Sequence, residues 1–251
     1  MITTLFTSQE INDVISNPCN TFVATTSGLD IINNNSLENI GYVVFSGGGF
    51  TSVYHKSDRC SGVLFLGTTY SGVQKLIIDP ISMSGNMSDE IVDAYLAPAK
   101  LTSNEVQIIT GSNNGDLAIA TNSGIDFYKA NSSAKVSTYF PGGMTSMFVT
   151  EAGDLYYSPV LSGGLYVKYS PINTNWSDPD YKLVAVGGFP TPSGVEFIPS
   201  NRINEIQISA AISGGHPCVF LATTSGLFIY EENRSDLSSS ISGAVLYRNI
   251  P

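Results

Sequence analysis

The sequence predicts an all-β fold built from a repeated unit, and three observations carry this prediction. Segments such as residues 203–209 alternate apolar and polar side chains, which is the period of a half-buried strand. One pattern of strand, glycine turn and strand recurs as FVATTSGLDI, FLGTTYSGVQK, IATNSGIDF and FLATTSGLFI. Charged residues make up only 13 % of the chain, which suits short strands joined by turns better than long exposed helices.

The turn glycines set the register of the repeat, because each follows a similar pair of strands. They are Gly28, Gly72, Gly124, Gly164 and Gly226. The units are about 50 residues long, which leaves room for four strands each and is typical of β-propeller blades. We therefore expect one domain, a single five-bladed β-propeller of four-stranded antiparallel blades. The expected blades are 7–46, 50–98, 104–140, 144–187 and 203–250, with 1–6 as a closing strand.

Each unit is expected to begin with an alternating strand and to end with an outer strand. The first strands are INDVIS, TSVYHKS, NEVQIIT, TSMFVT and NEIQISA, and the outer strands are YVVFS, IVDAYLA, KVSTYF, KLVAV and AVLYRNI. A Gly/Pro-rich connection, 188–202, precedes the last unit. The turn glycines are expected to supply the positive φ of a two-residue hairpin, and the preceding Ala-Thr to fill the strand against the next blade.

The strand–turn–strand pattern resembles the repeat of two-component regulator propellers. The match covers about ten residues in four of the five units, so the resemblance implies a propeller architecture. Those repeats usually begin with Trp, which is absent here, and their rings are larger. No kinase or receptor segment accompanies this sequence, so the resemblance does not imply a signalling role.

Charge narrows the expected partners. The net charge of −10 and the pI near 4.4 argue against binding nucleic acid through its phosphates or docking on an anionic membrane. The first residues lack the basic start and apolar run of a signal peptide, and no later run approaches the length of a membrane span. The expected setting is therefore cytoplasmic or virion-associated. All three cysteines, Cys19, Cys60 and Cys218, are expected to be unpaired, because equivalent positions of different repeats should lie apart.

A candidate metal site comes from the second residue of each first strand. Aligning the units places Asp13, Ser52, Glu105, Ser146 and Glu205 there, each preceded by Asn or Thr. Since the first strand of a blade is innermost, Asp13, Glu105 and Glu205 are expected to ring one mouth of the central channel. An oxygen-only lining suits a hard cation such as calcium, or ordered water. In the simpler interpretation, each acid accepts backbone N–H bonds at the start of its own strand; no other cofactor is expected.

A candidate partner-binding site lies in the loop NWSDPDY. Trp176 is the only tryptophan, and an exposed aromatic side chain beside Asp178 and Asp180 suits a sugar or a peptide. The two acids could also contribute to a calcium site. The alternatives are a half-buried loop anchor for Trp176 and a solvated turn for the acids.

The sequence favours a non-enzymatic recognition or scaffold protein that binds a protein or glycan, with a virion component as one setting. The two histidines, His55 and His216, fall in different units, and no metal-ligand spacing or nucleophile motif is present. The partner is expected at the end of the blades that carries loops 80–90, 170–181 and 231–242, opposite the Ser-Gly turns. The alternative is a glycoside hydrolase that uses two of the channel-mouth carboxylates as acid and nucleophile or base.

Overall fold

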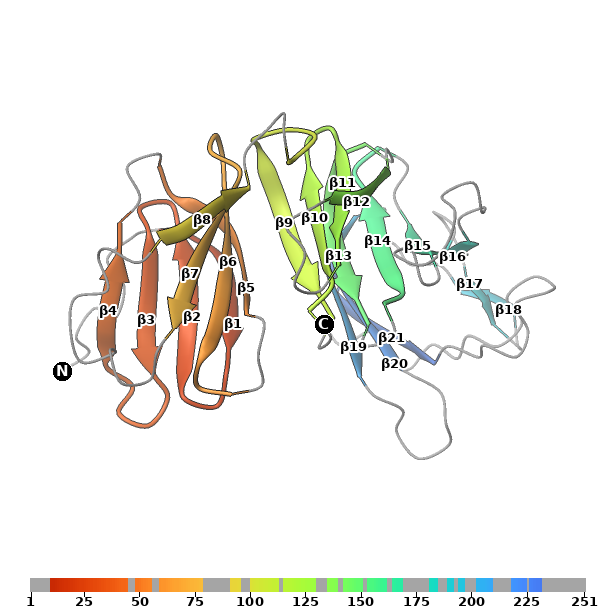
Figure 1. The fold of residues 1–251 in the computed structure, drawn as a ribbon. Coiled ribbons are helices and arrows are strands. Elements are labelled where there is room, and N and C mark those ends of the chain that lie inside the picture. Colours follow the sequence, from red (N-terminus) through yellow and green to blue (C-terminus); the bar gives the residue numbers. More distant parts are fainter. Residues whose placement is uncertain are drawn as a thin grey trace. The chain divides into compact units, whose positions relative to one another are not determined.

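The structure is a computed structural model that divides into two units, residues 1–140 and 141–251. It describes residues 10–44, 48–55, 59–78, 91–95, 100–112, 115–129, 135–139, 142–150, 153–161, 164–168, 181–184, 189–191, 194–196, 202–209, 218–224 and 226–231. Every regular element among these residues is a strand (Figure 1). The described part of the chain contains no helix long and apolar enough to cross a membrane.

The first unit contains three four-stranded antiparallel sheets, each connected in sequence order. Their strands are β1 (Ile11–Ser16), β2 (Asn20–Thr25), β3 (Leu29–Asn33) and β4 (Asn39–Val43); β5 (Phe50–His55), β6 (Gly62–Thr68), β7 (Val73–Ile78) and β8 (Ile91–Tyr95); and β9 (Val106–Gly111), β10 (Leu117–Thr121), β11 (Gly124–Tyr128) and β12 (Lys135–Tyr139). Each sheet is a meander in which every strand pairs with the next. The three predicted four-stranded repeats of this unit are therefore confirmed.

The second unit contains one four-stranded sheet, one three-stranded sheet and a short hairpin. The strands are β13 (Met144–Val149), β14 (Leu155–Pro159), β15 (Leu165–Lys168) and β16 (Tyr181–Val184); the hairpin β17 (Phe189–Thr191) and β18 (Gly194–Glu196); and β19 (Ile203–Ser209), β20 (Cys218–Thr223) and β21 (Gly226–Glu231). The hairpin stands where the sequence predicts only a connection. The predicted closing strands, 1–6 and 244–250, lie outside the described residues, so the closed five-bladed ring stays a prediction.

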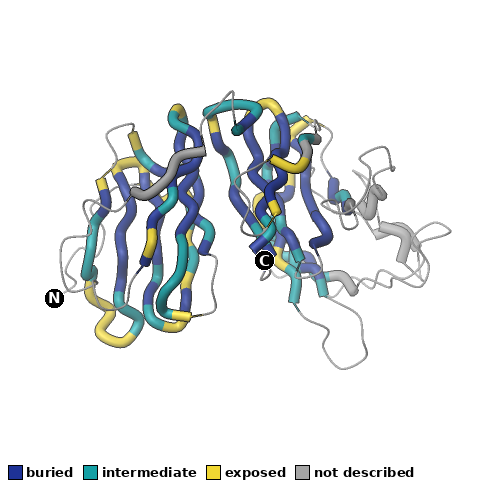
Figure 2. Tube along the Cα trace, in the orientation of Figure 1, coloured by how far each residue is buried: buried dark blue, intermediate teal, exposed yellow. Residues whose placement is uncertain are grey.

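The hydrophobic cores lie between neighbouring sheets, because successive side chains of a strand point to opposite faces. Strand β6 shows this arrangement. Leu64 and Leu66 join a core with Phe22 and Ile31 of the first sheet, whereas Phe65 joins a core with residues of the third sheet. In the second unit, residues of β14 and β15 pack in the same way against β19, β20 and β21. The middle strands β2, β6, β10, β11 and β14 are accordingly buried on both faces along most of their length (Figure 2).

The threonine before each turn has a different role from the one predicted, because its hydroxyl closes the turn. In the first repeat, Thr25 Oγ1 donates to the carbonyl of Gly28 over 2.8 Å and accepts the Gly28 N–H over 3.1 Å. Thr68, Thr121 and Thr223 make the equivalent bond to the turn glycine carbonyl. A buried hydroxyl bonded to the turn backbone explains why threonine recurs where valine would fill the strand equally well.

The turn glycines are needed for two different reasons. Gly72 has a φ of 70°, the left-handed region that the sequence predicts. Gly28 does not have a positive φ, and the prediction is wrong for it. Instead, a Cβ at Gly28 would lie 2.4 Å from the carbonyl oxygen of Val43 and 2.9 Å from the ring of Tyr42. Glycine is required at this turn because strand β4 passes too close for a side chain.

Within the first unit, the turns and the connections between sheets lie at one end of the sheets. The Thr26 N–H donates to the carbonyl of Glu10, and the Gly72 N–H donates to the carbonyl of Asn104, which lies before the third sheet. We call this the turn end. At the far end, the first strand of a sheet runs into the second and the third runs into the fourth. It comprises residues 17–19, 34–38, 59–61 and the ends of the loop 112–116.

Candidate functional site

The first strand of each three- or four-stranded sheet carries a β-bulge near its start, and the bulge corrects the sequence register. The pairing shifts between Ile11 and Asp13, between Phe50 and Ser52, between Met144 and Ser146, and between Ile203 and Glu205. In β9 the shift lies between Val106 and Ile108. The residue equivalent to Asp13 in the third sheet is therefore Ile108, and the predicted equivalence of Glu105 is wrong.

Asp13 connects the first sheet to the second. One carboxylate oxygen accepts the N–H of Val14 in its own strand over 2.8 Å. The other accepts two bonds from β5, from the hydroxyl of Ser52 over 2.9 Å and from the N–H of Val53 over 2.8 Å. The simpler interpretation of this acid is thus confirmed in its own strand and extends to the neighbouring sheet. Hydrogen bonds to a carboxylate are among the stronger ones in proteins.

Ser52 continues the same connection from the second sheet to the third. Its side chain is 2 % exposed, and its Oγ accepts the N–H of Ile109 over 3.0 Å while it donates to Asp13. Ile109 in β9 is the register equivalent of Val53 in β5, so the two sheet pairs use the same bond. In β9 the next side chain in the series is Ile108, which has no hydrogen-bonding group, and the series ends there.

The bulged residues add a second bond between the same sheets. Asn12 Nδ2 donates to the carbonyl of Phe50 over 2.7 Å, and Thr51 Oγ1 donates to the carbonyl of Val106 over 2.8 Å. Phe50 and Val106 hold equivalent positions at the start of their strands. In the second unit the bulged Thr145 donates instead to Ser158 of its own sheet, over 3.0 Å. The pairs Asn12–Asp13 and Thr51–Ser52 seen in the sequence therefore form bonds between sheets.

Replacing Ser52 with Ala tests these bonds. It leaves the buried Ile109 N–H without its acceptor and removes a donor from Asp13, so we expect the free energy of unfolding to fall by about 2 kcal/mol. Urea denaturation measures the change. Ser27→Ala, at an exposed turn serine, is the matched control and should change stability by less than about 0.5 kcal/mol. Equal stability of the two variants would mean that the cross-sheet bonds contribute nothing.

The other two predicted metal-site acids make local contacts. Glu105 precedes β9, is exposed, and accepts a bond from Asn122 Nδ2 over 2.7 Å. Glu205 is exposed on β19 and accepts a bond from Gln207 Nε2 over 3.0 Å. Among the residues that the structure describes, no three His, Cys, Asp or Glu side chains are grouped closely enough to hold a metal ion. The cation at Asp13, Glu105 and Glu205 stays a prediction.

A fully buried carboxylate, Asp126, lies on β11 of the third sheet, and the sequence reasoning missed it. Its oxygens accept the N–H and the hydroxyl of Thr102 and the hydroxyl of Thr138, each over 2.6 Å. Lys135 Nζ lies 3.1 Å from the same carboxylate. Asp126 thus joins β11 to β12 and to the segment before β9. The available signal is an acid in the third position of two apolar strands, GLDI and GIDF.

Tyr54 and Gly111 meet at the far end of the second and third sheets. The Tyr54 hydroxyl donates to the carbonyl of Ser112 over 3.1 Å, and its ring lies where a Cβ at Gly111 would approach within 2.8 Å. Burial raises the pKa of Tyr54 to about 12, because it disfavours the charged phenolate relative to the hydroxyl that donates this bond.

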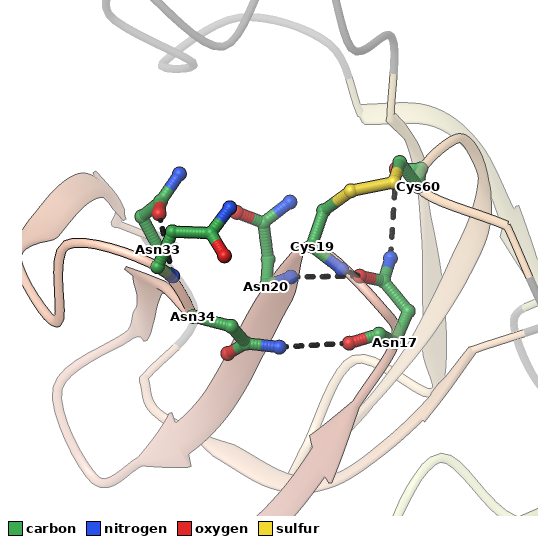
Figure 3. Close-up of a disulfide and its surroundings, with 7 residues drawn as sticks. Asn17, Cys19, Asn20, Asn33, Asn34 and Cys60 are labelled. Carbon is green, nitrogen blue, oxygen red and sulfur yellow. Dashed lines mark hydrogen bonds between the residues drawn. A yellow bond between two sulfur atoms is a disulfide. The ribbon is translucent and has the colours of Figure 1, made fainter.

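Cys19 and Cys60 form a disulfide, and the prediction that they are unpaired is wrong. Their Cα atoms lie 5.2 Å apart, in the far-end loops of the first and second sheets (Figure 3). Cys19 and Cys218 hold equivalent positions of different repeats, but Cys60 lies in the loop of the adjacent repeat, next to Cys19. Cys218, at the start of β20, is a free, partly buried thiol.

An asparagine cluster holds the chain around Cys19. Asn17 is 7 % exposed, and its Oδ1 accepts the N–H groups of Cys19 and Asn20 over 2.9 and 2.8 Å. Asn34 Nδ2 donates to the carbonyl of Asn17 over 2.8 Å (Figure 3). Asn34 Oδ1 accepts the Thr21 hydroxyl over 2.7 Å. Asn34 begins a glycosylation sequon, but its amide nitrogen is committed to this cluster.

The predicted partner-binding residues Trp176, Asp178 and Asp180 lie outside the described residues, and so do loop 80–90 and most of loops 170–181 and 231–242. The prediction that a partner binds there is therefore still a prediction.

Comparison with known proteins shows the fold. No protein-family model matches the chain, and no curated protein matches it in sequence. Among solved structures, it is similar to the WD40 β-propeller domain of Doa1, with a TM-score of 0.64 and 9 % identity over 93 % of this chain and 68 % of that one. It is also similar to the extracellular domain of a hybrid two-component system from B. thetaiotaomicron, with a TM-score of 0.61 and 14 % identity over 100 % of this chain and 30 % of that one.

A third similar structure is PorZ, a bacterial surface component of the type-IX secretion system of Porphyromonas gingivalis. Its TM-score is 0.55, with 13 % identity over 97 % of this chain and 29 % of that one. The chain thus spans about a third of the length of the latter two proteins. At these identities the similarity shows the fold alone, and the predicted β-propeller repeat architecture is confirmed.

Proposed function

We propose that this protein is a non-enzymatic recognition or scaffold module, a single five-bladed β-propeller that binds a protein or glycan partner at the far end of its blades. The supporting observation is the use of polar groups on the inner strands of the first unit. Asn12, Asp13, Thr51 and Ser52 all bond to the next sheet. Polar side chains that bond to the next sheet make the framework rigid and are not available to bind a partner. Binding would then be carried out by the loops that the framework supports.

The far end is the better candidate for the binding face because its loops differ most between repeats. In the sequence these are 80–90, 170–181 and 231–242, whereas the turn end repeats one closed Thr–Gly turn. Loops held by a rigid scaffold can vary in sequence without changing the fold. Trp176, Asp178 and Asp180 would supply an aromatic surface with acidic neighbours, and the weakly charged composition fits a virion component.

Deleting residues 172–179 tests the proposed face. We expect capture of the partner to fall at least tenfold, while the melting temperature changes by less than about 2 °C, because a surface loop contributes little to the core. Cross-linking pull-down with quantitative mass spectrometry and a glycan array read out binding. Tyr70→Ala is the matched control, since Tyr70 is a large side chain that is 75 % exposed at the turn end.

Two outcomes contradict this proposal. Loss of binding in Tyr70→Ala but not in the deletion would place the partner at the turn end. Turnover of any substrate on a broad glycoside panel would favour the glycoside hydrolase instead. No described contact favours that alternative, because Asp13 is committed to Ser52 and Val53, and Glu105 lies before the inner strand.

A further inference from the structure

At the far end of the first unit, a disulfide joins the first pair of sheets and a side-chain hydrogen bond joins the next pair. Between the second and third sheets, the Tyr54 hydroxyl reaches the carbonyl of Ser112 at the far end. The register equivalent of Tyr54 in β1 is Ile15, since each follows the bulged residue by three positions. Ile15 has no group that could cross to the second sheet, and Cys19–Cys60 joins the two sheets at that end instead.

Hydrogen bonds hold the backbone around Cys19 in the position that the disulfide requires. Asn17 accepts the backbone N–H groups of Cys19 and Asn20, and Asn34 holds the carbonyls of Asn17 and Cys19 through its side-chain and backbone N–H groups. Asn17 Nδ2 also reaches the carbonyl of Cys60, at 3.5 Å. The contacts fix the backbone on the Cys19 side and hold it towards the Cys60 loop. Because these hydrogen bonds already fix the backbone around Cys19, less conformational entropy is lost when the disulfide forms.

We propose that Cys19–Cys60 is a structural disulfide of the working protein, and that the chain acts in an oxidising environment rather than among reduced thiols. Structural disulfides persist in such environments and are rare in reducing cytosol. The bond forms by exchange with a disulfide oxidant, either glutathione disulfide or a dithiol-disulfide oxidoreductase. One thiolate attacks the oxidant to give a mixed disulfide, and the other displaces it; two protons and two electrons pass to the oxidant, which leaves as two thiols.

The thiol count of the intact protein tests the state of the bond. The free thiols of wild-type protein from its native source are blocked with N-ethylmaleimide under denaturing, non-reducing conditions, and the intact mass is measured by mass spectrometry. We expect one adduct, at Cys218, and three after reduction. Peptide mapping should show Cys19 joined to Cys60. Three adducts without reduction would overturn the proposal, and so would one adduct with a pairing that involves Cys218.

Melting under reductant tests whether the bond is structural. The disulfide closes a segment with a sequence separation of 41 residues, so reduction of the wild type should lower the melting temperature by roughly 5–10 °C. Cys218→Ser should show the same fall, and Cys19→Ser/Cys60→Ser should show none. If the double variant does not fold, the comparison of oxidised and reduced wild type still decides. An unchanged melting temperature on verified reduction would overturn the structural role.

Discussion

Replacing Asp126 with Ala is expected to lower the free energy of unfolding by about 3–4 kcal/mol. The carboxylate is fully buried and accepts bonds from Thr102 and Thr138, with Lys135 at 3.1 Å. Removing it leaves the Thr102 N–H and two hydroxyls without their acceptor and Lys135 without its counter-charge. Removing one partner from a buried charged network costs far more than removing a surface pair. Urea denaturation monitored by tyrosine fluorescence gives the value.

Two further variants separate the causes of this loss. Asp126→Asn keeps one acceptor oxygen and should lose about half as much stability, because the charge disappears but some bonds survive. Glu38→Gln removes an exposed carboxylate and should change stability by less than about 0.5 kcal/mol. If Asp126→Ala behaved like Glu38→Gln, the carboxylate would not be what joins β11 to β12.

Gly28→Ala is expected to cost about 2–4 kcal/mol, although it adds only one methyl group. The new Cβ would lie 2.4 Å from the Val43 carbonyl oxygen, and a backbone atom of β4 cannot move aside as a flexible side chain can. We expect the transition midpoint in urea to fall with little change in the slope of the transition.

Gly41→Ala is the matched control, because it adds the same methyl group on β4 itself. Its nearest neighbour would be Ile31 Cδ1 at 3.5 Å, an ordinary contact. Replacing a strand glycine without strain also reduces the entropy of the unfolded chain, so this variant should be neutral or slightly stabilising. Equal losses in both variants would refute the close approach as the reason for Gly28.

The sequence predicts the strands of the repeats well, because alternation and turn glycines are local signals. Segments such as INDVIS and KVSTYF form β1 and β12 where the pattern places them. The position of the bulge is less visible. Asn104 and Glu105 resemble Asn12 and Asp13 in sequence, yet the pairing makes Ile108 the equivalent of Asp13, since the bulge in β9 falls at Gln107. The Asn-acid pattern thus aligned Glu105 with Asp13, although the two residues hold different positions in the strand pairing.

The disulfide and the buried carboxylate could not be predicted for a different reason. Both depend on which loops and strands become neighbours. Cys60 is 41 residues from Cys19, and only the side-by-side packing of the first two sheets brings them together. Asp126 reads as an ordinary polar residue of a strand until Thr102, from the preceding connection, is placed against it.

The bonds between sheets in the first unit have a consequence for how such a chain can evolve. Asn12 and Thr51 both donate to a main-chain carbonyl of the following sheet, and Asp13 and Ser52 both accept a main-chain N–H from it. Every residue type except proline offers those two groups. A repeat can therefore be duplicated, exchanged or heavily mutated and still form these bonds with the neighbouring sheet, provided that the bulge stays at the same position. The side chains around these contacts can change widely while the bonds between the sheets remain.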